Sequence, residues 1–447
     1  MNTTKLRDKD LEWADYALIS AMSIQRKSAT DVIARCKEAN VKTIAGGPLF
    51  TTDYEDFVDV VDHLVLNEAE ATLPRFLKDL EAGHAEKMYT SDEYVNLQKT
   101  PLPLWELVDM KKYASMNLQY SRGCPFDCEF CDISVLFGRR VRTKTRDQVL
   151  AELDSLYSRK YRGDVFFVDD NFIGNRSKLK NDILPAIIAW NEAKGRPFSF
   201  QTEATIDLSD DEELIQLMVR AGFSSVFIGI ETTNEDSLSE CNKLQNKNRD
   251  LLACVSKIHK LGLRVMAGFI LGFDNDPPSI FERTSAFIQN SGIASAMIGL
   301  LNAPRHTKLY QRLAKEGRLL GEETGDHMDL AINFIPAMDY DTLIQGYKAV
   351  VRRIYSPPAY YQRLKKFLRE FKPLQIKAPR LRISSLKISY LQALPRSVLL
   401  LGIIGKERLH YWNLIFWTLF RRPRLVPLAV TLAIHGFHFR RFSESYL

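Results

Sequence analysis

Three cysteines, Cys124, Cys128 and Cys131, lie in one short stretch of the sequence, "SRGCPFDCEFCD". Three residues separate the first pair and two residues separate the second pair. Three thiolates on a four-iron cluster leave one iron atom without a protein ligand, and that iron can bind a further molecule. A zinc ion completed by a distant histidine, or three structural thiols, are the alternative interpretations. We expect no disulfide at the remaining cysteines, Cys36, Cys241 and Cys254.

A second group of polar residues accompanies apolar, strand-like runs. Asp169, Asp170 and Asn171 follow one run, Glu203 lies in the next, and Glu231 ends the one after. Charges on buried strands are unfavourable unless they are paired or bind a ligand. Helix N-caps and ordinary salt bridges are the alternatives for each residue taken singly. As a group, these residues favour a ligand site.

Two glycines, Gly268 and Gly272, lie in the apolar run "LRVMAGFILGF". A glycine in a strand lets a flat ligand such as adenine approach the backbone, or it marks a bend in the chain. The sequence leaves both interpretations open.

Six strand-like runs must position these residues, and a helical segment follows each run. The runs cover residues 117–123, 164–172, 198–206, 224–232, 263–273 and 295–304. Near-continuous apolar strands that alternate with helices predict a parallel sheet, and six repeats predict a partial (βα)6 barrel. Active-site residues of such barrels lie at the C-terminal ends of the strands, where the polar residues occur.

The first part of the chain also alternates between apolar runs and helical segments, over residues 15–83. This pattern predicts an α/β sheet of parallel strands joined by crossover helices. Ligands bind such sheets at the loops that follow the strands, so residues 20–23, 46–48 and 67–70 are candidate ligand-facing turns. The prolines at positions 101 and 103 predict a linker between this sheet and the barrel.

The last third of the chain is rich in basic residues, and its pattern predicts helices. Pro357 and Pro358 divide residues 343–373 into two expected helices. The segments 394–405 and 409–442 are rich in aliphatic and aromatic residues with arginines at their borders. Neither contains an apolar run of the roughly 20 residues that a membrane-spanning helix needs. A buried helical subdomain and an amphipathic surface for a peripheral membrane contact are the two interpretations.

Composition excludes several classes of protein. The chain has 447 residues, 45% hydrophobic and 26% charged, which is enough for a buried core in two or three domains. The net charge of +6 is modest, so we expect no nucleic-acid partner. The N-terminus has no apolar signal-peptide core, and clustered thiols suit a reducing compartment. We therefore expect a cytoplasmic protein, with membrane association through the C-terminal region as the alternative.

The cysteine spacing resembles the signature of the radical SAM superfamily, including the aromatic Phe130 before the third cysteine. Stretches such as "VFFVDDNFIGN", "VFIGIETTNEDSL" and "LLNAPRHTKLY" resemble one group in particular. This is the cobalamin-binding radical SAM proteins with a C-terminal domain of unknown function (DUF4070), which include the hopanoid C-2 methylase. The resemblance implies four segments: a Rossmann-like cobalamin domain over 1–90, a linker over 91–115, a radical SAM partial barrel over 116–320, and a helical domain over 321–447.

The resemblance also implies roles for individual residues. Cys124, Cys128 and Cys131 would bind a 4Fe-4S cluster. Contacts to S-adenosyl-L-methionine would come from Phe130, Asp169, Asp170, Asn171, Glu203, Glu231, Gly268 and Gly272. Contacts to cobalamin would come from Ser20, Ala21, Met22, Gly46, Gly47, Pro48, Asn67 and Glu68.

The sequence departs from this family in the cobalamin domain. Relatives have about half a Rossmann unit before the stretch "KLRDKDLEWADY". We therefore expect the domain to be truncated and to expose an apolar edge. We also expect Met1 to be an internal methionine of a longer product. Asn67 stands where relatives usually have glycine. No Asp-x-His-x-x-Gly motif is present, so we expect His63 to be structural and not a cobalt ligand.

These observations predict a class B, cobalamin-dependent radical SAM methyltransferase. It would methylate an unactivated carbon of an apolar substrate, a lipid-like molecule or a tetrapyrrole, through a 5'-deoxyadenosyl radical and methylcobalamin. A flavodoxin- or ferredoxin-type donor would supply electrons. A radical SAM oxidoreductase or cyclase without cobalamin, and a degenerate non-catalytic fragment, are the alternatives. The sequence assigns no catalytic acid or base.

Overall fold

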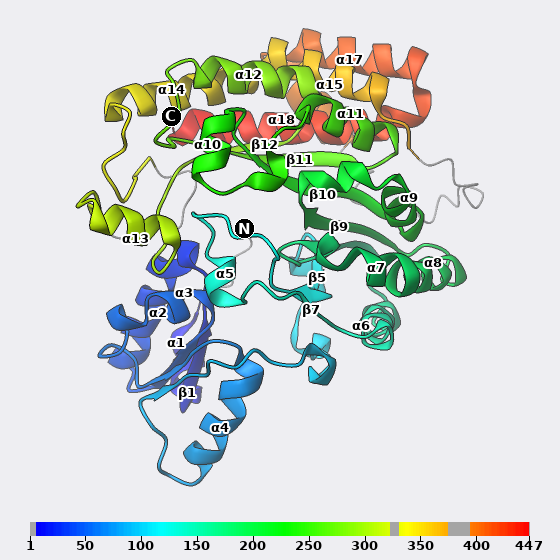
Figure 1. Ribbon diagram of the computed structural model, residues 1–447. Helices are drawn as coiled ribbons and strands as arrows, with labels where there is room; N and C mark the ends of the chain where they lie inside the picture. Colours follow the sequence, from blue (N-terminus) through cyan, green and yellow to red (C-terminus); the bar gives the residue numbers. More distant parts are fainter. Residues whose placement is uncertain (1–5, 322–329, 374–393, 447) are drawn as a thin grey trace. The chain divides into compact units, whose positions relative to one another are not determined.

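The computed structural model describes residues 6–321, 330–373 and 394–446. The described chain divides into two compact units that interleave along the sequence (Figure 1). One unit contains residues up to 114 together with 120–155 and 302–335, and the other contains 115–119, 156–301 and 336 onward. The four segments expected from the sequence stay a prediction.

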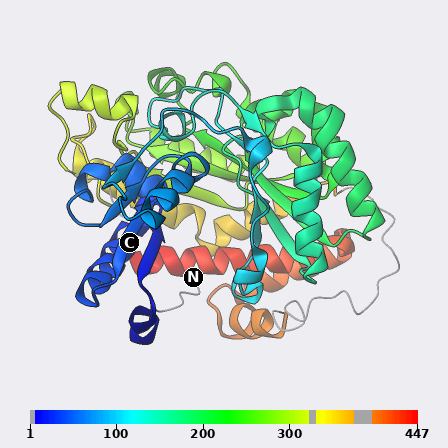
Figure 2. The same cartoon turned by 90° about the horizontal axis from the view of Figure 1, so that it is seen from below.

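The second unit is built on one six-stranded parallel sheet (Figure 1 and Figure 2). Its strands lie in the order β12-β11-β10-β9-β8-β5, so five successive crossovers each add a neighbouring strand. The strands are β5 (Met116–Leu118), β8 (Gly163–Phe167), β9 (Phe198–Ala204), β10 (Phe223–Glu231), β11 (Arg264–Leu271) and β12 (Ala296–Leu300). This order confirms the six predicted runs and the partial barrel.

Helices connect these strands. They are α6 (Arg146–Ser158), α7 (Arg176–Lys178), α8 (Leu184–Ala193), α9 (Glu212–Ala221), α10 (Glu235–Glu240), α11 (Leu251–Lys260) and α12 (Ile280–Ser291). Side chains along β8, β9 and β11 alternate between buried and half-buried. A strict alternation means that one face of the sheet is sealed by the helices while the other is open in part. The half-buried face is the interior of the partial barrel, and Glu203 and Gly268 belong to it.

The first unit contains a four-stranded parallel sheet in the order β1-β2-β3-β4. Its strands are β1 (Tyr16–Ser20), β2 (Lys42–Gly46), β3 (His63–Val65) and β4 (Met88–Tyr89), and its helices are α1 (Asp8–Trp13), α2 (Arg26–Glu38), α3 (Pro48–Thr52) and α4 (Ala69–Glu81). Phe76 of α4 packs with Ile44, Val65 and Tyr89 on one face. Ile33 of α2 and Leu49 of α3 pack with Ala45 and Leu64 on the other. The predicted α/β alternation is confirmed.

The cysteine stretch also belongs to the first unit. The short strands β6 (Ser121–Arg122) and β7 (Arg142–Thr143) pair in an antiparallel manner. They bring together the two ends of residues 121–143, the whole of which is here called the cysteine stretch. Between them lies α5 (Ile133–Leu136), and α13 (Lys308–Lys315) belongs to the same unit.

The C-terminal region of the second unit is helical, as predicted. It contains α14 (Tyr340–Ile354), α15 (Pro357–Glu370), the π-helix η11 (Val398–Ile404), α17 (Arg408–Arg421) and α18 (Val426–Tyr446), the long red helix of Figure 2. Pro357 stands in the first turn of α15, where its missing N–H costs nothing. Glycines allow close packing: a Cβ atom at Gly346 would lie 2.3 Å from the ring of Phe281, and one at Gly436 would lie 2.1 Å from Tyr360. In the described part of the chain, every helix is too short or too polar to cross a bilayer.

Candidate functional site

Four carboxylates gather at the C-terminal ends of the neighbouring strands β8, β9 and β10. Asp169 and Asp170 follow β8, Glu203 lies near the end of β9, and Glu231 ends β10. Burial, and then the negative charges of Asp170, Asp169 and Glu231, raise the pKa of Glu203 to about 7. Carboxylates that raise one another's pKa in this way favour the binding of a positively charged group.

Glu231 is held by the backbone and by a lysine that sequence reasoning missed. The residue has a positive φ of 63° and lies in a bulge of β10, a conformation that is rare for residues other than glycine. Its Oε1 atom accepts a hydrogen bond of 2.7 Å from Nζ of buried Lys243. The carboxylate folds back over Gly229, where a Cβ atom would lie 2.1 Å from Oε1. Glu231 thus forms a salt bridge with Lys243, and its contact with a ligand stays a prediction.

Gly268 lies in β11 and Gly272 follows it directly, and glycine suits each position for a different reason. Gly268 pairs in register with Gly229 of β10, and a Cβ atom at Gly268 would lie 3.0 Å from the ring of Phe227. Gly272 has a φ of 106°, and its N–H donates to Oδ2 of buried Asp276 at 3.0 Å. Burial raises the pKa of Asp276. The bend interpretation is thus confirmed for Gly272, whereas Gly268 lies on the open face of the sheet.

The remaining predicted contact on this side is Asn171, which is buried and precedes the turn η6 (Phe172–Asn175). It continues the polar stretch at the end of β8. All members of this group outside the cysteine stretch lie in the second unit, and the structure brings the carboxylates among them together.

The backbone shapes the cysteine stretch. Gly123 has a φ of 87°, and a Cβ atom there would lie 2.7 Å from the carbonyl oxygen of Arg140. The N–H of Cys124 donates to the carbonyl of Gly138 at 3.3 Å, and the N–H of Cys131 donates to the carbonyl of Cys128 at 3.1 Å. None of the six cysteines, all within the described residues, forms a disulfide.

Helix α13 fixes the two acidic residues between the cysteines. Arg312 Nε donates to Oε1 of Glu129 at 2.8 Å, and Lys308 forms an ion pair with Asp127. The N–H of Leu309 donates to the carbonyl of Glu129 at 3.0 Å. The stretch is thus held by a helix that lies almost two hundred positions further along the chain.

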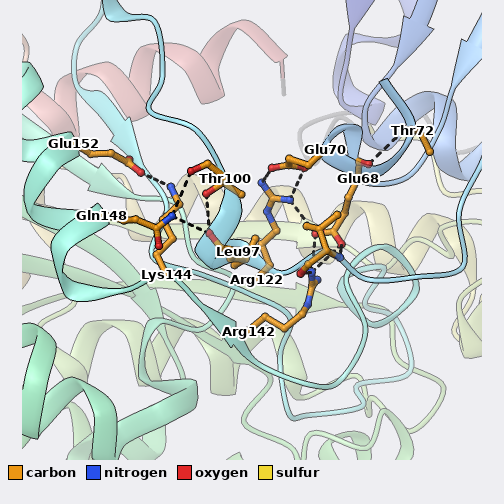
Figure 3. Close-up of polar contacts among 11 residues, drawn as sticks. Glu68, Glu70, Thr72, Leu97, Thr100, Arg122, Arg142, Lys144, Gln148 and Glu152 are labelled. Atoms are coloured by element: carbon orange, nitrogen blue, oxygen red, sulfur yellow. Dashed lines mark hydrogen bonds and ion pairs between the residues drawn. The ribbon is translucent and has the colours of Figure 1, made fainter. Parts of the chain in front are cut away.

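A second set of ion pairs holds the two ends of the stretch (Figure 3). Arg122 donates to Glu68 at 2.9 Å and to Glu70 at 2.7 Å, and Arg142 donates to the other oxygen of Glu68 at 2.8 Å. The side chain of Glu68 is only 2% exposed. Although burial opposes it, the hydrogen bond and charge of Arg122 hold the pKa of Glu70 below its ordinary value. The loop between β3 and α4 therefore anchors the cysteine stretch.

Figure 3 also shows the hydrogen bonds that hold the segment around Leu97 and Thr100. Gln148 Nε2 donates to the carbonyls of Leu97 at 3.1 Å and Thr100 at 3.3 Å. Lys144, which lies just before α6, forms an ion pair with Glu152 of that helix. Burial raises the pKa of Glu152 in spite of the positive charge of Lys144. These contacts place the predicted linker along α6.

The three candidate turns of the four-stranded sheet lie at its C-terminal edge. The N–H of Leu49 donates to the carbonyl of Ala21 at 3.0 Å, which joins the first two turns. Gly47 has a φ of 88°, and a Cβ atom there would lie 2.6 Å from Oγ of Ser20. Pro48 begins α3. Met22 is 60% exposed at this edge.

The third turn contains Asn67, which has a φ of 61°. Its N–H donates to Oγ1 of Thr51 at 2.9 Å, and its side chain accepts from Thr90 at 2.6 Å. Asparagine tolerates positive φ better than most residues, which suits its place in this turn. His63 forms a 2.7 Å hydrogen bond with the carbonyl of Glu86, in agreement with a structural role.

Among the described residues, no three His, Cys, Asp or Glu side chains are close enough to share one metal ion. An iron–sulfur cluster does not need this geometry, because each thiolate binds a different iron atom. Ligation by Cys124, Cys128 and Cys131 stays a prediction.

Comparison with known proteins decides the family. The radical SAM superfamily matches residues 118–288, and a domain of unknown function (DUF4070) matches residues 307–447. An uncharacterized methyltransferase of Synechocystis sp. is 37% identical over 449 residues, which cover 99% of this chain and 82% of the relative. The hopanoid C-2 methylase of Rhodopseudomonas palustris is 32% identical over 437 residues, covering 95% and 81%.

The chain belongs to the radical SAM superfamily. Its fold is also that of TsrM from Kitasatospora setae, a radical S-adenosylmethionine methyltransferase solved with cobalamin and a [4Fe-4S] cluster. The TM-score is 0.63 at 12% identity, over 95% of this chain and 88% of TsrM. In this radical SAM chain, the DUF4070 region begins just before α13, so the helix that fixes Asp127 and Glu129 is part of it.

Proposed function

We propose that the chain is a cobalamin-dependent radical SAM methyltransferase that methylates an unactivated carbon of an apolar substrate. The observation that carries this proposal is the acidic cluster at the ends of β8, β9 and β10, where neighbouring charges and burial raise the pKa of Glu203 to about 7. S-adenosylmethionine has a sulfonium and an ammonium group, and a positive charge relieves the repulsion among these carboxylates.

The residues fit the cofactors that this function needs. Cys124, Cys128 and Cys131 would hold a 4Fe-4S cluster, since three thiolates in a backbone-shaped loop leave one iron open. The turns at Ser20 and Gly47, with exposed Met22 beside them, would face cobalamin. When bound, these groups supply the 5'-deoxyadenosyl radical and the methyl group. The protein's part is to hold and orient them.

Further partners follow from this chemistry. A flavodoxin- or ferredoxin-type protein would reduce the cluster. Because a hydrogen atom must be removed from an unactivated carbon, we expect the substrate to present an aliphatic position, in a lipid-like molecule or a tetrapyrrole. The relative named hopanoid C-2 methylase supports methylation at carbon.

Calorimetric titration with S-adenosylmethionine under anaerobic conditions tests the proposal. Asp170→Asn and Glu231→Gln should each weaken binding on the order of tenfold, the effect of about 1.4 kcal/mol. Glu213→Gln is the control, since Glu213 has a side chain that is 72% exposed on α9. Unchanged affinity in both site variants would contradict the assignment of the carboxylates.

Cobalamin retention after reconstitution separates the proposed reaction from a radical SAM oxidoreductase or cyclase. We expect the 447-residue chain to bind cobalamin poorly, and Gly47→Val to lose on gel filtration what the parent retains. A valine there would meet Ser20 and a positive φ. Folding of the variant is checked by circular dichroism. Cobalamin-free protein that still forms 5'-deoxyadenosine would favour the oxidoreductase or cyclase.

A further inference from the structure

Helix α17 and the preceding π-helix η11 expose a large apolar surface, here called the α17 surface. On α17, Tyr411, Leu414 and Thr418 are buried on one side, as expected for a helix that packs against α15 and α18. The opposite side should then be polar. It is instead apolar, because Leu409 is 78% exposed, Phe416 is 51% exposed and Phe420 is 81% exposed.

The π-helix η11 extends this apolar surface. Nε1 of Trp412 donates to the carbonyl of Gly402 at 2.9 Å, which holds η11 against α17. Ile403 and Ile404 are 57% and 67% exposed. Four further residues are also exposed, namely Leu394, Leu399, Leu400 and Leu419. Contiguous exposed apolar side chains of this number mark a surface that binds a partner.

The charges around the α17 surface have one sign. Between Leu394 and Arg424, the basic residues Arg396, Lys406, Arg408, Arg421 and Arg424 are exposed, and Arg422 is half-buried. The acidic residue in this range is Glu407, which is 1% exposed and forms a 2.7 Å ion pair with Arg440. A partner of this surface therefore meets apolar side chains and positive charge together.

We propose that the α17 surface binds the interface of an anionic lipid bilayer. An interfacial helix combines an apolar face with lysine and arginine at its borders, and this is the composition of the α17 surface. Basic residues near a membrane are attracted by acidic headgroups. With 14 residues, α17 is shorter than the roughly 20 residues of a spanning helix, so it lies in the interface. This inference does not rest on the proposed methyl transfer, since it concerns binding alone.

Co-sedimentation of the 447-residue chain with vesicles tests the inference. The probes are vesicles of equal parts phosphatidylglycerol and phosphatidylcholine, and vesicles of phosphatidylcholine alone. We expect binding to the anionic vesicles, with an affinity that falls as salt is added. Leu409→Ser/Phe420→Ser should weaken it at least tenfold. The matched control is Leu104→Ser/Leu107→Ser, which changes residues that are 62% and 78% exposed on the first unit.

A charge variant separates the two contributions. Lys406→Gln/Arg408→Gln/Arg424→Gln should remove most of the preference for anionic vesicles and flatten the salt dependence. In one contrary outcome, the parent fails to bind vesicles and instead self-associates, and Leu409→Ser/Phe420→Ser abolishes the self-association. That result would show that a second copy covers the surface, and it would overturn the proposal. No vesicle binding, with a lower Tm of the same variant, would overturn it in favour of coverage by residues 374–393.

Discussion

The raised pKa of Glu203 reflects the burial and the charges around this one residue. Its side chain points to the half-open face of a parallel sheet, where strand alternation places it beside the ends of β8 and β10. Burial disfavours its charged form, and the carboxylates of Asp170, Asp169 and Glu231 add repulsion. Lys243 pairs with Glu231 within this cluster, yet the pKa of Glu203 is still raised to about 7.

This argument predicts the pH dependence of stability. The folded protein keeps a proton on Glu203 up to a pKa of about 7, whereas the unfolded chain loses it near the ordinary glutamate pKa of 4.5. Stability should therefore fall as pH rises from about 4.5 to about 7, because the folded state binds more protons in that window. A shift of this size corresponds to about 3 kcal/mol at most, and partial solvent exposure reduces this to about 1–2 kcal/mol.

Glu203→Gln removes the titrating group. We expect the ligand-free variant to have a higher Tm than the parent at pH 8 and nearly the same Tm at pH 4.5. Thermal unfolding at several pH values measures the difference, and Glu213→Gln serves again as the exposed control. A Tm difference that does not change with pH would mean that Glu203 titrates normally.

At the level of elements, the cysteine stretch is fixed by parts of the chain that are remote in sequence. Glu68 belongs to the loop before α4, yet it binds Arg122 and Arg142 at the two ends of the stretch. Removing one partner of a buried ion pair leaves an uncompensated charge and costs about 3–5 kcal/mol. The loop of the four-stranded sheet therefore determines the geometry of the cysteines.

Glu68→Gln should disturb the cysteine stretch more than it disturbs the rest of the fold. We expect less iron per chain after anaerobic reconstitution, and a weaker absorbance near the charge-transfer bands of the cluster. Glu81→Gln is the matched control, because Glu81 is exposed at the end of α4 and lies outside these ion pairs. Equal iron content in the two variants would show that the ion pairs of Glu68 do not position the cysteines.

The sequence predicted the elements better than it predicted these contacts. Periodicity marked all six strands of the large sheet and the proline break between α14 and α15, because those signals are local. Strand β4 escaped notice, since two residues carry no periodicity. The pairs of Glu68 with Arg122 and Arg142, and of Glu231 with Lys243, were missed because they join residues whose proximity depends on the folded chain. The carboxylates were found because charge on a buried strand is itself unusual.

At the level of the whole molecule, exposed apolar side chains include those of the α17 surface and those on and before the edge strand β1. Among the described residues, β1 pairs with β2 alone, so its other edge presents unpaired N–H and C=O groups. Leu18 is 63% exposed on this strand, and Trp13, which precedes it in α1, is 85% exposed. The exposed apolar edge expected from the sequence is thus confirmed for the described chain. Exposed edges of this kind pair with other chains.

The last prediction concerns this edge. The 447-residue chain should self-associate as its concentration rises, because a second copy can satisfy the backbone groups of β1 and bury Leu18. Leu18→Lys should lower the sedimentation coefficient at high concentration, since a charged side chain on an edge strand opposes pairing with another edge. Leu320→Lys is the control, because Leu320 is 62% exposed and is not part of β1. A parent chain that stays monomeric at high concentration, or two variants that behave alike, would show that β1 is not the associating edge.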